Sequence, residues 1–237
     1  MGWESLFSVM LAAAVPMAVP LLLVALGEMF DQRAGLFNLG AECMMMMGAF
    51  AAFFIDLKFH MPWLGLAAAL AVGALLGLLL GLVCITFKAR QGIAGIGLYM
   101  LGWGISGTLF RVYVGGPTPV TGIPALRLDL LRSVPWVGSV LATLSPMDYV
   151  AFALIPLLSY LLFRTSWGLK VRAVGTTPRA ADTLGIDVSR VRYQCVILAG
   201  AFAGLAGAYL SVCSARMFAD NITAGRGFIA VALVYFG

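Results

Sequence analysis

Two stretches of this sequence place polar side chains inside or beside long apolar segments, where they could hydrogen-bond a small polar molecule. Asn38 and Glu42 belong to the first stretch, and Asn221 and Thr223 belong to the second. Polar groups at membrane depth are tolerated where they meet a partner or line a cavity. Each stretch is therefore a candidate for a solute path formed by an interrupted helix.

A local explanation is also open for the first stretch. Asn38 is a good N-cap, and Glu42 would then lie in the first turn of the helix, where the helix dipole favours a carboxylate. The residue types alone do not separate this capping role from a solute path.

The sequence contains few of the residues that form catalytic or metal-binding sites. There is a single histidine, His60, and the four cysteines form no CxxC pair. Neither a zinc ligand set nor a Ser/His/Asp triad can be assembled from them. The sequence also lacks GxxxxGK[ST], the phosphate loop of many ATPases. We therefore expect no metal, no cofactor and no enzymatic activity in this chain.

A third stretch, residues 164–192, is polar and contains six of the chain's 15 Lys and Arg residues. Thr177 is a suitable N-cap, Pro178 suits the first helical position, and Gly185 suits the position after the last turn. The residues that follow Pro178 are helix formers: Arg179, Ala180 and Ala181. We expect a short, rigid surface helix over 178–184, about 10 Å long.

The elements that position these stretches must be membrane helices. Hydrophobic residues make up 62% of the chain, charged residues make up 11%, and the mean hydropathy is +1.01. A soluble domain has roughly half apolar and a quarter charged residues. The composition predicts an all-α, polytopic integral membrane bundle with interrupted helices, in contact with lipid. The net charge of +5 lies mostly in loops. It therefore indicates how the chain is oriented in the membrane, and we expect no nucleic-acid partner.

A window of about 20 residues, the length that crosses a bilayer, locates the spans. They lie near 5–27, 36–56, 63–87, 93–113, 147–163 and 193–214, with a partial span from 227. We interpret residues 1–237 as a single transmembrane domain. The segment 227–237 is too short to cross, so either it turns back inside the protein or the chain is C-terminally incomplete. We favour incompleteness.

The distribution of positive charge among the loops predicts the orientation. Nine Lys and Arg residues lie in three loops: 28–35, 88–92 and 164–192. Because positive loops stay in the cytoplasm, we expect these loops inside and the N-terminus outside. Loop 114–146 is then external, with a short helix near Leu126 to Val140.

Glycines recur at helical spacing in two of the spans. Gly73 and Gly77 form one such pair, and Gly200 and Gly204 form another. In lipid, small residues let helix backbones approach closely. The pattern indicates close helix packing, either within this bundle or between subunits.

Four segments, in this order, resemble the permease subunits of ABC importers. They are ALGEMFDQRAGLFNLGAECMMMMGAF, KARQGIAGIGL, LLFRTSWGLKVRAVGTTPRAADTLGIDVSRVRYQCVILAGAFAGLAGAYLSV and FADNITAGRGFIAVALVYFG. The resemblance covers nearly the whole chain and is weakest in 114–146. It is to the branch for simple sugars, nucleosides and branched-chain amino acids, and within it to nucleoside-type permeases with a basic-membrane-lipoprotein kind of receptor.

The resemblance implies an importer in a bacterial or archaeal plasma membrane. Its partners would be a second permease subunit, two cytoplasmic ATPase subunits that bind the ATP, and an external solute-binding receptor. The solute would be a nucleoside or a simple sugar. The family's coupling loop implies that the following residues contact the ATPase: Gly175, Thr177, Pro178, Arg179, Ala180, Ala181 and Gly185. The candidates for the solute path remain Asn38, Glu42, Asn221 and Thr223.

Three positions depart from the family's pattern. Arg179 replaces the acidic first residue of the coupling motif, so this chain lacks the carboxylate through which the motif could make a contact. Phe37 is an additional bulky residue before Asn38, and Cys43 replaces the glycine after Glu42.

Two other function classes remain. An ion-coupled secondary transporter of a small polar solute needs a buried acidic relay, and Glu42 is the one carboxylate well inside a predicted span. The third class is an intramembrane enzyme or a structural membrane subunit. The shortage of histidine and of paired carboxylates disfavours an enzyme.

Overall fold

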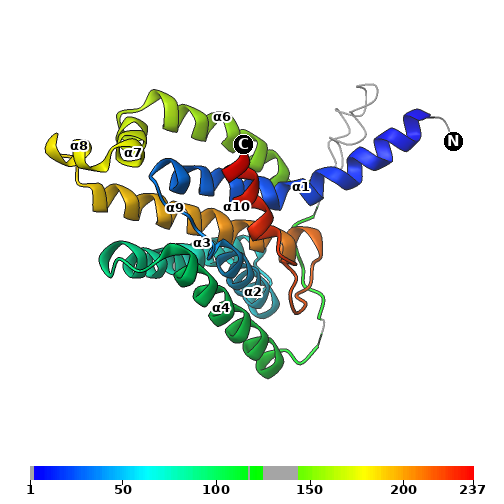
Figure 1. Cartoon of the computed structure of the whole chain (residues 1–237). Helices are drawn as coiled ribbons and strands as arrows, with labels where there is room; N and C mark the ends of the chain where they lie inside the picture. The colour runs from blue at the N-terminus through cyan, green and yellow to red at the C-terminus, as the bar shows by residue number, and fades with distance from the viewer. Residues whose placement is uncertain (1–2, 117, 125–143) are drawn as a thin grey trace.

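Helices lie at every predicted span. The computed structural model describes residues 3–116, 118–124 and 144–237, and the regular structure in these residues is helical (Figure 1). In chain order the elements are α1 (Trp3–Arg33), α2 (Ala41–Phe59), α3 (Pro62–Gly81), η1 (Leu82–Thr86), α4 (Gln91–Tyr113), α6 (Pro146–Arg164), α7 (Ser166–Thr176), α8 (Pro178–Thr183), α9 (Val188–Ala208), η3 (Tyr209–Ser214) and α10 (Arg226–Phe236). The π-helical turns η1 and η3 directly continue α3 and α9.

Among the described residues, five helices are long and apolar enough to cross a membrane. They are Ala13–Arg33, Pro62–Thr86, Gln91–Tyr113, Pro146–Arg164 and Val188–Ser214. α2 is not among these five, because its 19 residues include Glu42, Asp56 and Lys58. Both of its carboxylates are buried in the protein interior. The all-α, polytopic class predicted from composition is confirmed.

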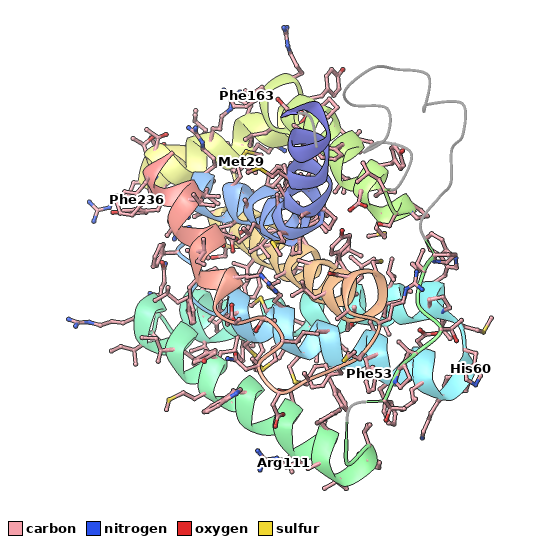
Figure 2. The ribbon with its side chains drawn as sticks, turned by 90° about the vertical axis from the view of Figure 1, so that its right-hand side faces the viewer. Met29, Phe53, His60, Arg111, Phe163 and Phe236 are labelled. Carbon is pink, nitrogen blue, oxygen red and sulfur yellow. The ribbon has the colours of Figure 1, made fainter. Side chains whose placement is uncertain are left out.

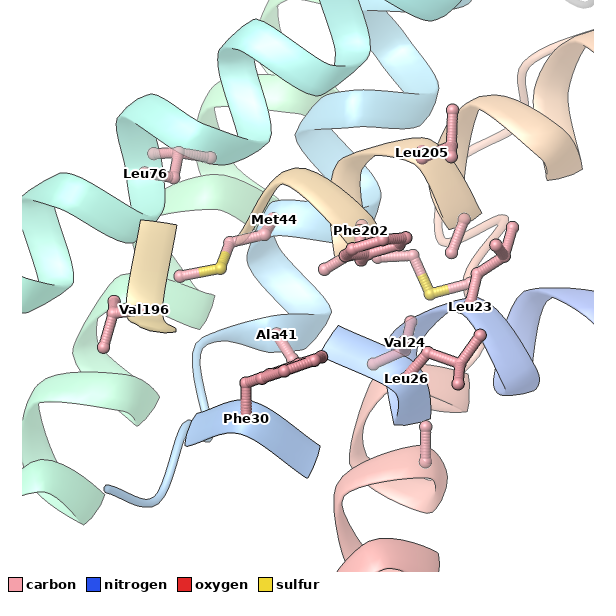
Figure 3. Packing of buried hydrophobic residues seen from close by; sticks show 14 of the residues in the cluster. Leu23, Val24, Leu26, Phe30, Ala41, Met44, Leu76, Val196, Phe202 and Leu205 are labelled. Carbon is pink, nitrogen blue, oxygen red and sulfur yellow. The ribbon is translucent and has the colours of Figure 1, made fainter. Parts of the chain in front are cut away.

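α9 is the centre of the bundle. The protein itself buries 83% of the apolar 18-residue stretch within Val188–Ser214, which is α9 with η3, against 28% of the corresponding stretch of α4. α1, α2 and α3 all pack against α9. Figure 3 shows Phe202 of α9 on the side that faces Leu23 and Val24 of α1.

Glycines let α3 and α9 approach closely. A Cβ atom at Gly73 would meet the backbone oxygen of Gly200, and one at Gly77 would lie 2.5 Å from the backbone oxygen of Val196. Because lipid gives little hydrophobic drive between helices, such close backbone packing stabilises the crossing. The predicted glycine packing is confirmed within this bundle.

The link between the first two helices lies later in the chain than predicted. α1 continues through Glu28 and Asp31 to Arg33, and α2 begins only at Ala41, so the predicted boundaries at 27 and 36 are wrong. Glu28 and Asp31 are 1% and 0% exposed. Hydropathy assigns such carboxylates to a loop, but interior contacts let the helix carry them.

Asn38 does not cap α2. The N-cap position is Gly40, which makes no side-chain capping bond. The Asn38 amide instead donates to the Asp31 carboxylate (3.4 Å), and the Asn38 backbone N–H donates to Glu28 (3.3 Å). The capping interpretation of Asn38 is therefore wrong, because tertiary contacts with α1 hold its side chain.

One end of the bundle, which we call the basic end, gathers the link 34–40, the link 87–90 and residues 165–187. The backbone N–H of Phe37 donates to the Gln91 side chain across this end (2.9 Å). These are the same loops that the charge distribution groups together on one side of the membrane.

The opposite end gathers the remaining described loops. The backbone N–H of Gly122 donates to the Asp56 carboxylate (2.8 Å), and that of Val120 donates to the carbonyl of Arg216 (2.9 Å). Residues 118–124 are thereby fastened to α2 and to the chain after η3. The helix predicted near Leu126 to Val140 lies outside the described residues.

Candidate functional site

The basic end carries two short helices, α7 and α8, where one was predicted. The Thr165 side chain precedes α7 and accepts a hydrogen bond from the N–H of Gly168 (3.1 Å). Val171 and Val174 are fully buried against the bundle. α7 was missed because its positive charges indicate a loop, while its buried face is only two turns long.

α8 begins at the residue that its sequence predicts, and the predicted glycine follows its end. Thr177 occupies the N-cap, Pro178 is the first helical residue, and Gly185 follows the helix with a φ of +81°, the left-handed conformation that glycine tolerates best. The Thr177 side chain makes no capping hydrogen bond. The helix ends at Thr183, one residue earlier than expected.

Most of α8 faces solvent, and Figure 1 shows α7 and α8 at one extremity of the molecule. Arg179 and Ala180 are exposed, Pro178 is partly buried, and Ala181 is 2% exposed. Leu184, directly after the helix, is 81% exposed. The predicted coupling residues thus divide into an exposed face and a base that packs on the protein.

α7 fixes this helix pair to α1 and α9. Gly175 lies so close to α1 that a Cβ atom would overlap the carbonyl oxygen of Arg33. The Trp167 indole N–H donates to the Gln194 side chain of α9 (2.7 Å). Gly175, one of the predicted coupling residues, therefore lies at a contact between α7 and α1 of this chain.

The second candidate region, residues 217–225, lies between η3 and α10 and leads directly into α10. Its first anchor is Phe218, which is fully buried. The Phe218 ring centroid lies 5.5 Å from that of Phe50, 5.8 Å from that of Phe53 and 5.1 Å from that of Phe110. Rings at these separations make favourable edge and tilted contacts, so the aromatic cluster fixes the start of the segment.

Glu42 anchors the other end of the 217–225 segment. Its carboxylate accepts hydrogen bonds from the Thr223 hydroxyl (2.5 Å), the Gly225 N–H (2.9 Å) and the Gly227 N–H (2.6 Å). The last two donors lie at the start of α10, so a carboxylate on α2 caps a different helix. We call this set of contacts the Glu42 clasp.

The backbone of the segment is strained next to the clasp. Asn221 and Ala224 have φ values of +60° and +48°. Residues other than glycine rarely adopt this left-handed region, and they do so where surrounding contacts hold them. Gly227 has no room for a side chain, because a Cβ atom there would lie 2.6 Å from the Glu42 carboxylate.

The four predicted solute-path residues occupy different surroundings. Glu42 and Thr223 meet in the clasp and are 1% and 0% exposed. Asn38 is equally buried and belongs to a separate cluster with Glu28 and Asp31. Asn221 is exposed beside α4.

Sequence reasoning missed several residues of these clusters. Glu28 and Asp31 were assigned to a loop, although their spacing of three residues at a helix end is a signal that could have placed them on one face. Phe218 has no comparable local signal. Within the described residues, no group of three or more His, Cys, Asp or Glu side chains could hold a metal ion.

The chain belongs to the family described as the branched-chain amino acid transport system / permease component, whose model matches residues 10–237. It is a permease subunit of an ABC transporter and a multi-pass plasma-membrane protein. The family predicted from the four sequence segments is confirmed.

The relatives that are similar over nearly the whole chain include the following three. A putative glucose ABC transporter permease protein of Haloferax volcanii is 38% identical over 231 residues, which cover 96% of this chain and 70% of the relative. A guanosine ABC transporter permease protein of Bacillus subtilis is 36% identical over 244 residues, covering 98% and 76%. A nucleoside ABC transporter permease protein of Lactococcus lactis is 31% identical over 229 residues, covering 93% and 72%. No solved structure shows a significant match.

Proposed function

We propose that this chain forms the solute path of an ATP-driven importer of nucleosides or simple sugars, and that α8 couples this path to a separate cytoplasmic ATPase. The relatives named for glucose, guanosine and nucleoside transport support this solute class. The proposed assembly contains a second permease subunit, two ATPase subunits that bind the ATP, and an external solute-binding receptor. The relatives come from bacteria and an archaeon, which supports a bacterial or archaeal plasma membrane as the location of this chain.

One observation carries the proposed coupling: α8 is exposed on its surface and fixed at its base. Ala181 is buried on the side of α8 that faces the protein. Gly175, near the end of the preceding helix α7, packs on α1. After it, the Asp187 side chain caps α9 by accepting from the N–H of Arg190 (2.9 Å). A partner that moves α8 would therefore move α1 and α9 with it.

A chain of contacts leads from the basic end to the 217–225 segment. α1 contacts Asn38 through Asp31, and α2, which follows Asn38, carries Glu42. Glu42 in turn holds Thr223 and the start of α10. In the proposed mechanism, movement of α1 relative to α2 shifts this segment and switches the path between outward and inward access.

The proposed orientation places the basic end in the cytoplasm, because positively charged loops stay there. The opposite end, where residues 118–124 lie across α2, then faces the receptor. α8 meets the ATPase in this orientation, and solute arrives from the other side.

A negative charge introduced on the exposed face of α8 tests the coupling. The complex is purified with its ATPase and receptor, and ATP hydrolysis is measured with and without guanosine or glucose. We expect Ala180→Glu to remove the solute-stimulated hydrolysis. The matched control is Ser166→Glu, which adds the same charge at an exposed position of α7 and should retain stimulation. Equal stimulation in both variants would contradict the role of α8.

A further inference from the structure

A cavity of about 270 Å³ lies between α4 and the 217–225 segment. α4 contributes Trp103, Thr108 and Arg111, and the segment contributes Asp220 and Asn221. The volume is just under the roughly 300 Å³ at the small end of the range for ligand pockets. Of the four predicted path residues, Asn221 alone lines it.

Two glycines keep the cavity open. A Cβ atom at Gly104 would have no atom within 4 Å, and one at Gly107 would have only the Asp220 carboxylate, at 3.6 Å. The cavity is therefore bounded by helix backbone on this side. On this side the shape of the cavity follows from the glycine positions and not from a side-chain rotamer.

The cavity contains an ion pair with free hydrogen-bonding capacity. The Arg111 guanidinium lies 3.6 Å from the Asp220 carboxylate, and the two side chains are 78% and 49% exposed. An ion pair this exposed contributes little to stability. Both groups can still bind hydroxyl groups, and Asn221 adds an amide with a donor and an acceptor.

The two anchors of the 217–225 segment hold these groups in place. Phe218 is fixed in the aromatic cluster before Asp220, and Thr223 is fixed by Glu42 after Asn221. The left-handed backbone of Asn221 lies between the anchors. A polar pair positioned by buried anchors on both sides suits a binding site, because the ordering is complete before a ligand arrives.

The cavity begins at the end of the bundle opposite to the basic end. Arg111 lies in the last turn of α4, and Figure 2, which views the molecule from the side opposite to α7 and α8, shows it at the lower edge. Gly104 lies seven residues earlier, which is about 10 Å deeper along the helix. This length along the helix equals about a third of the thickness of a hydrocarbon core of about 30 Å.

We propose that this cavity is a binding subsite for a neutral ring that carries vicinal hydroxyl groups, as in the ribose of a nucleoside or in a hexose. Asp220, Arg111 and Asn221 bind the hydroxyls, and Trp103 contacts the apolar face of the ring. The paired charges cancel, which suits a neutral solute. This assignment rests on the proposed function and names the chemistry by which its path recognises the solute.

The first test removes the carboxylate without changing its size. Proteoliposomes hold the complete complex with its receptor and ATP, and uptake of guanosine, glucose, leucine and 2′,3′-dideoxyguanosine is measured. For Asp220→Asn we expect the concentration for half-maximal uptake of guanosine or glucose to rise about tenfold or more, because hydrogen bonds to a charged group are lost. Uptake of the dideoxy compound should change little, since it lacks the hydroxyls.

Three results would overturn the assignment in different ways. Unchanged guanosine and glucose uptake by Asp220→Asn, beside an active wild type, would remove the subsite and leave the proposed function standing. Leucine uptake that fails in Asp220→Asn would assign the charged pair to an amino acid. A wild-type complex that takes up neither guanosine nor glucose would overturn the proposed solute class together with the subsite.

The second test fills the cavity. Gly104→Leu places a side chain where no atom lies within 4 Å, so the fold has room for it. We expect normal assembly and loss of uptake. Ile105→Phe is the matched control, because it adds bulk at the neighbouring exposed position, outside the cavity. Full uptake by Gly104→Leu would contradict the subsite.

Discussion

The helices α8 and α10 begin in opposite ways. α8 has six residues at the surface of the basic end, and its signals, Thr177, Pro178 and Gly185, all lie within a short stretch of sequence. α10 has 11 residues and begins inside the bundle, where the acceptor for its first N–H groups is Glu42, 183 residues away from Gly225 in the chain. Water can satisfy the end of an exposed helix, but a helix that starts in apolar surroundings needs a protein acceptor.

Removal of the Glu42 carboxylate has the largest expected effect on stability. In Glu42→Ala, three donors lose their acceptor, and each buried unsatisfied donor costs about 1–3 kcal/mol. We therefore expect little folded protein, with Glu42→Gln intermediate because it keeps one acceptor oxygen. The thermal midpoint in detergent measures the effect, and Asp182→Ala on the exposed side of α8 is the control. A wild-type midpoint for Glu42→Ala would remove the contrast between the two helices.

Glycine substitutions sharpen the comparison. Gly227→Ala would place a Cβ atom 2.6 Å from the Glu42 carboxylate and 2.7 Å from its Cα atom, and overpacking of this kind costs about 1–3 kcal/mol. Gly185 and Gly225 have positive φ values but open space around them, so alanine there costs about 1 kcal/mol of backbone strain. Unfolding in mixed detergent should rank Gly227→Ala as the most destabilised. The reverse order would show that the clasp is not tightly packed.

The capping residues at the basic end should differ by less. Asp187 caps α9 with a hydrogen bond to the N–H of Arg190 (2.9 Å), so Asp187→Ala should cost about 1 kcal/mol. Thr177 makes no capping bond, and Thr177→Ala should cost only a few tenths of that. Free energies of unfolding compare the two variants. An equal loss in both would mean that the Thr177 hydroxyl caps α8 after all.

Leu184 should have the smallest effect on folding. Its side chain is 81% exposed, and surface substitutions usually change stability by about 0.5 kcal/mol or less. Leu184→Asp should therefore unfold like the wild type while it loses solute-stimulated ATP hydrolysis, because the proposed partner no longer buries an apolar side chain. Stimulation at the wild-type level would place the ATPase contact elsewhere.

Hydropathy and local end signals predict most of the fold. The spans follow from runs of apolar residues, and α8 follows from Thr177, Pro178 and Gly185, because these features act over a few neighbouring residues. The prediction fails at Glu28 and Asp31, where burial by other helices reverses the expectation for charged residues. It also misses α7, whose buried face is short.

The Glu42 clasp could not be predicted in the same way. Glu42 and Thr223 are 181 residues apart, and only the packing of α2 beside α10 brings them together. The sequence identifies both residues as unusual polar groups in apolar surroundings. Which of them face each other, and which of them face a cavity as Asn221 does, depends on the tertiary structure.

Uptake into proteoliposomes tests the proposed function most directly. The vesicles contain this chain with a second permease, the ATPase and the receptor, and uptake of labelled guanosine and glucose is measured with ATP alone and with a sodium or proton gradient alone. We expect accumulation with ATP and none with either gradient. Accumulation driven by an ion gradient in the absence of ATP would contradict an ATP-driven importer.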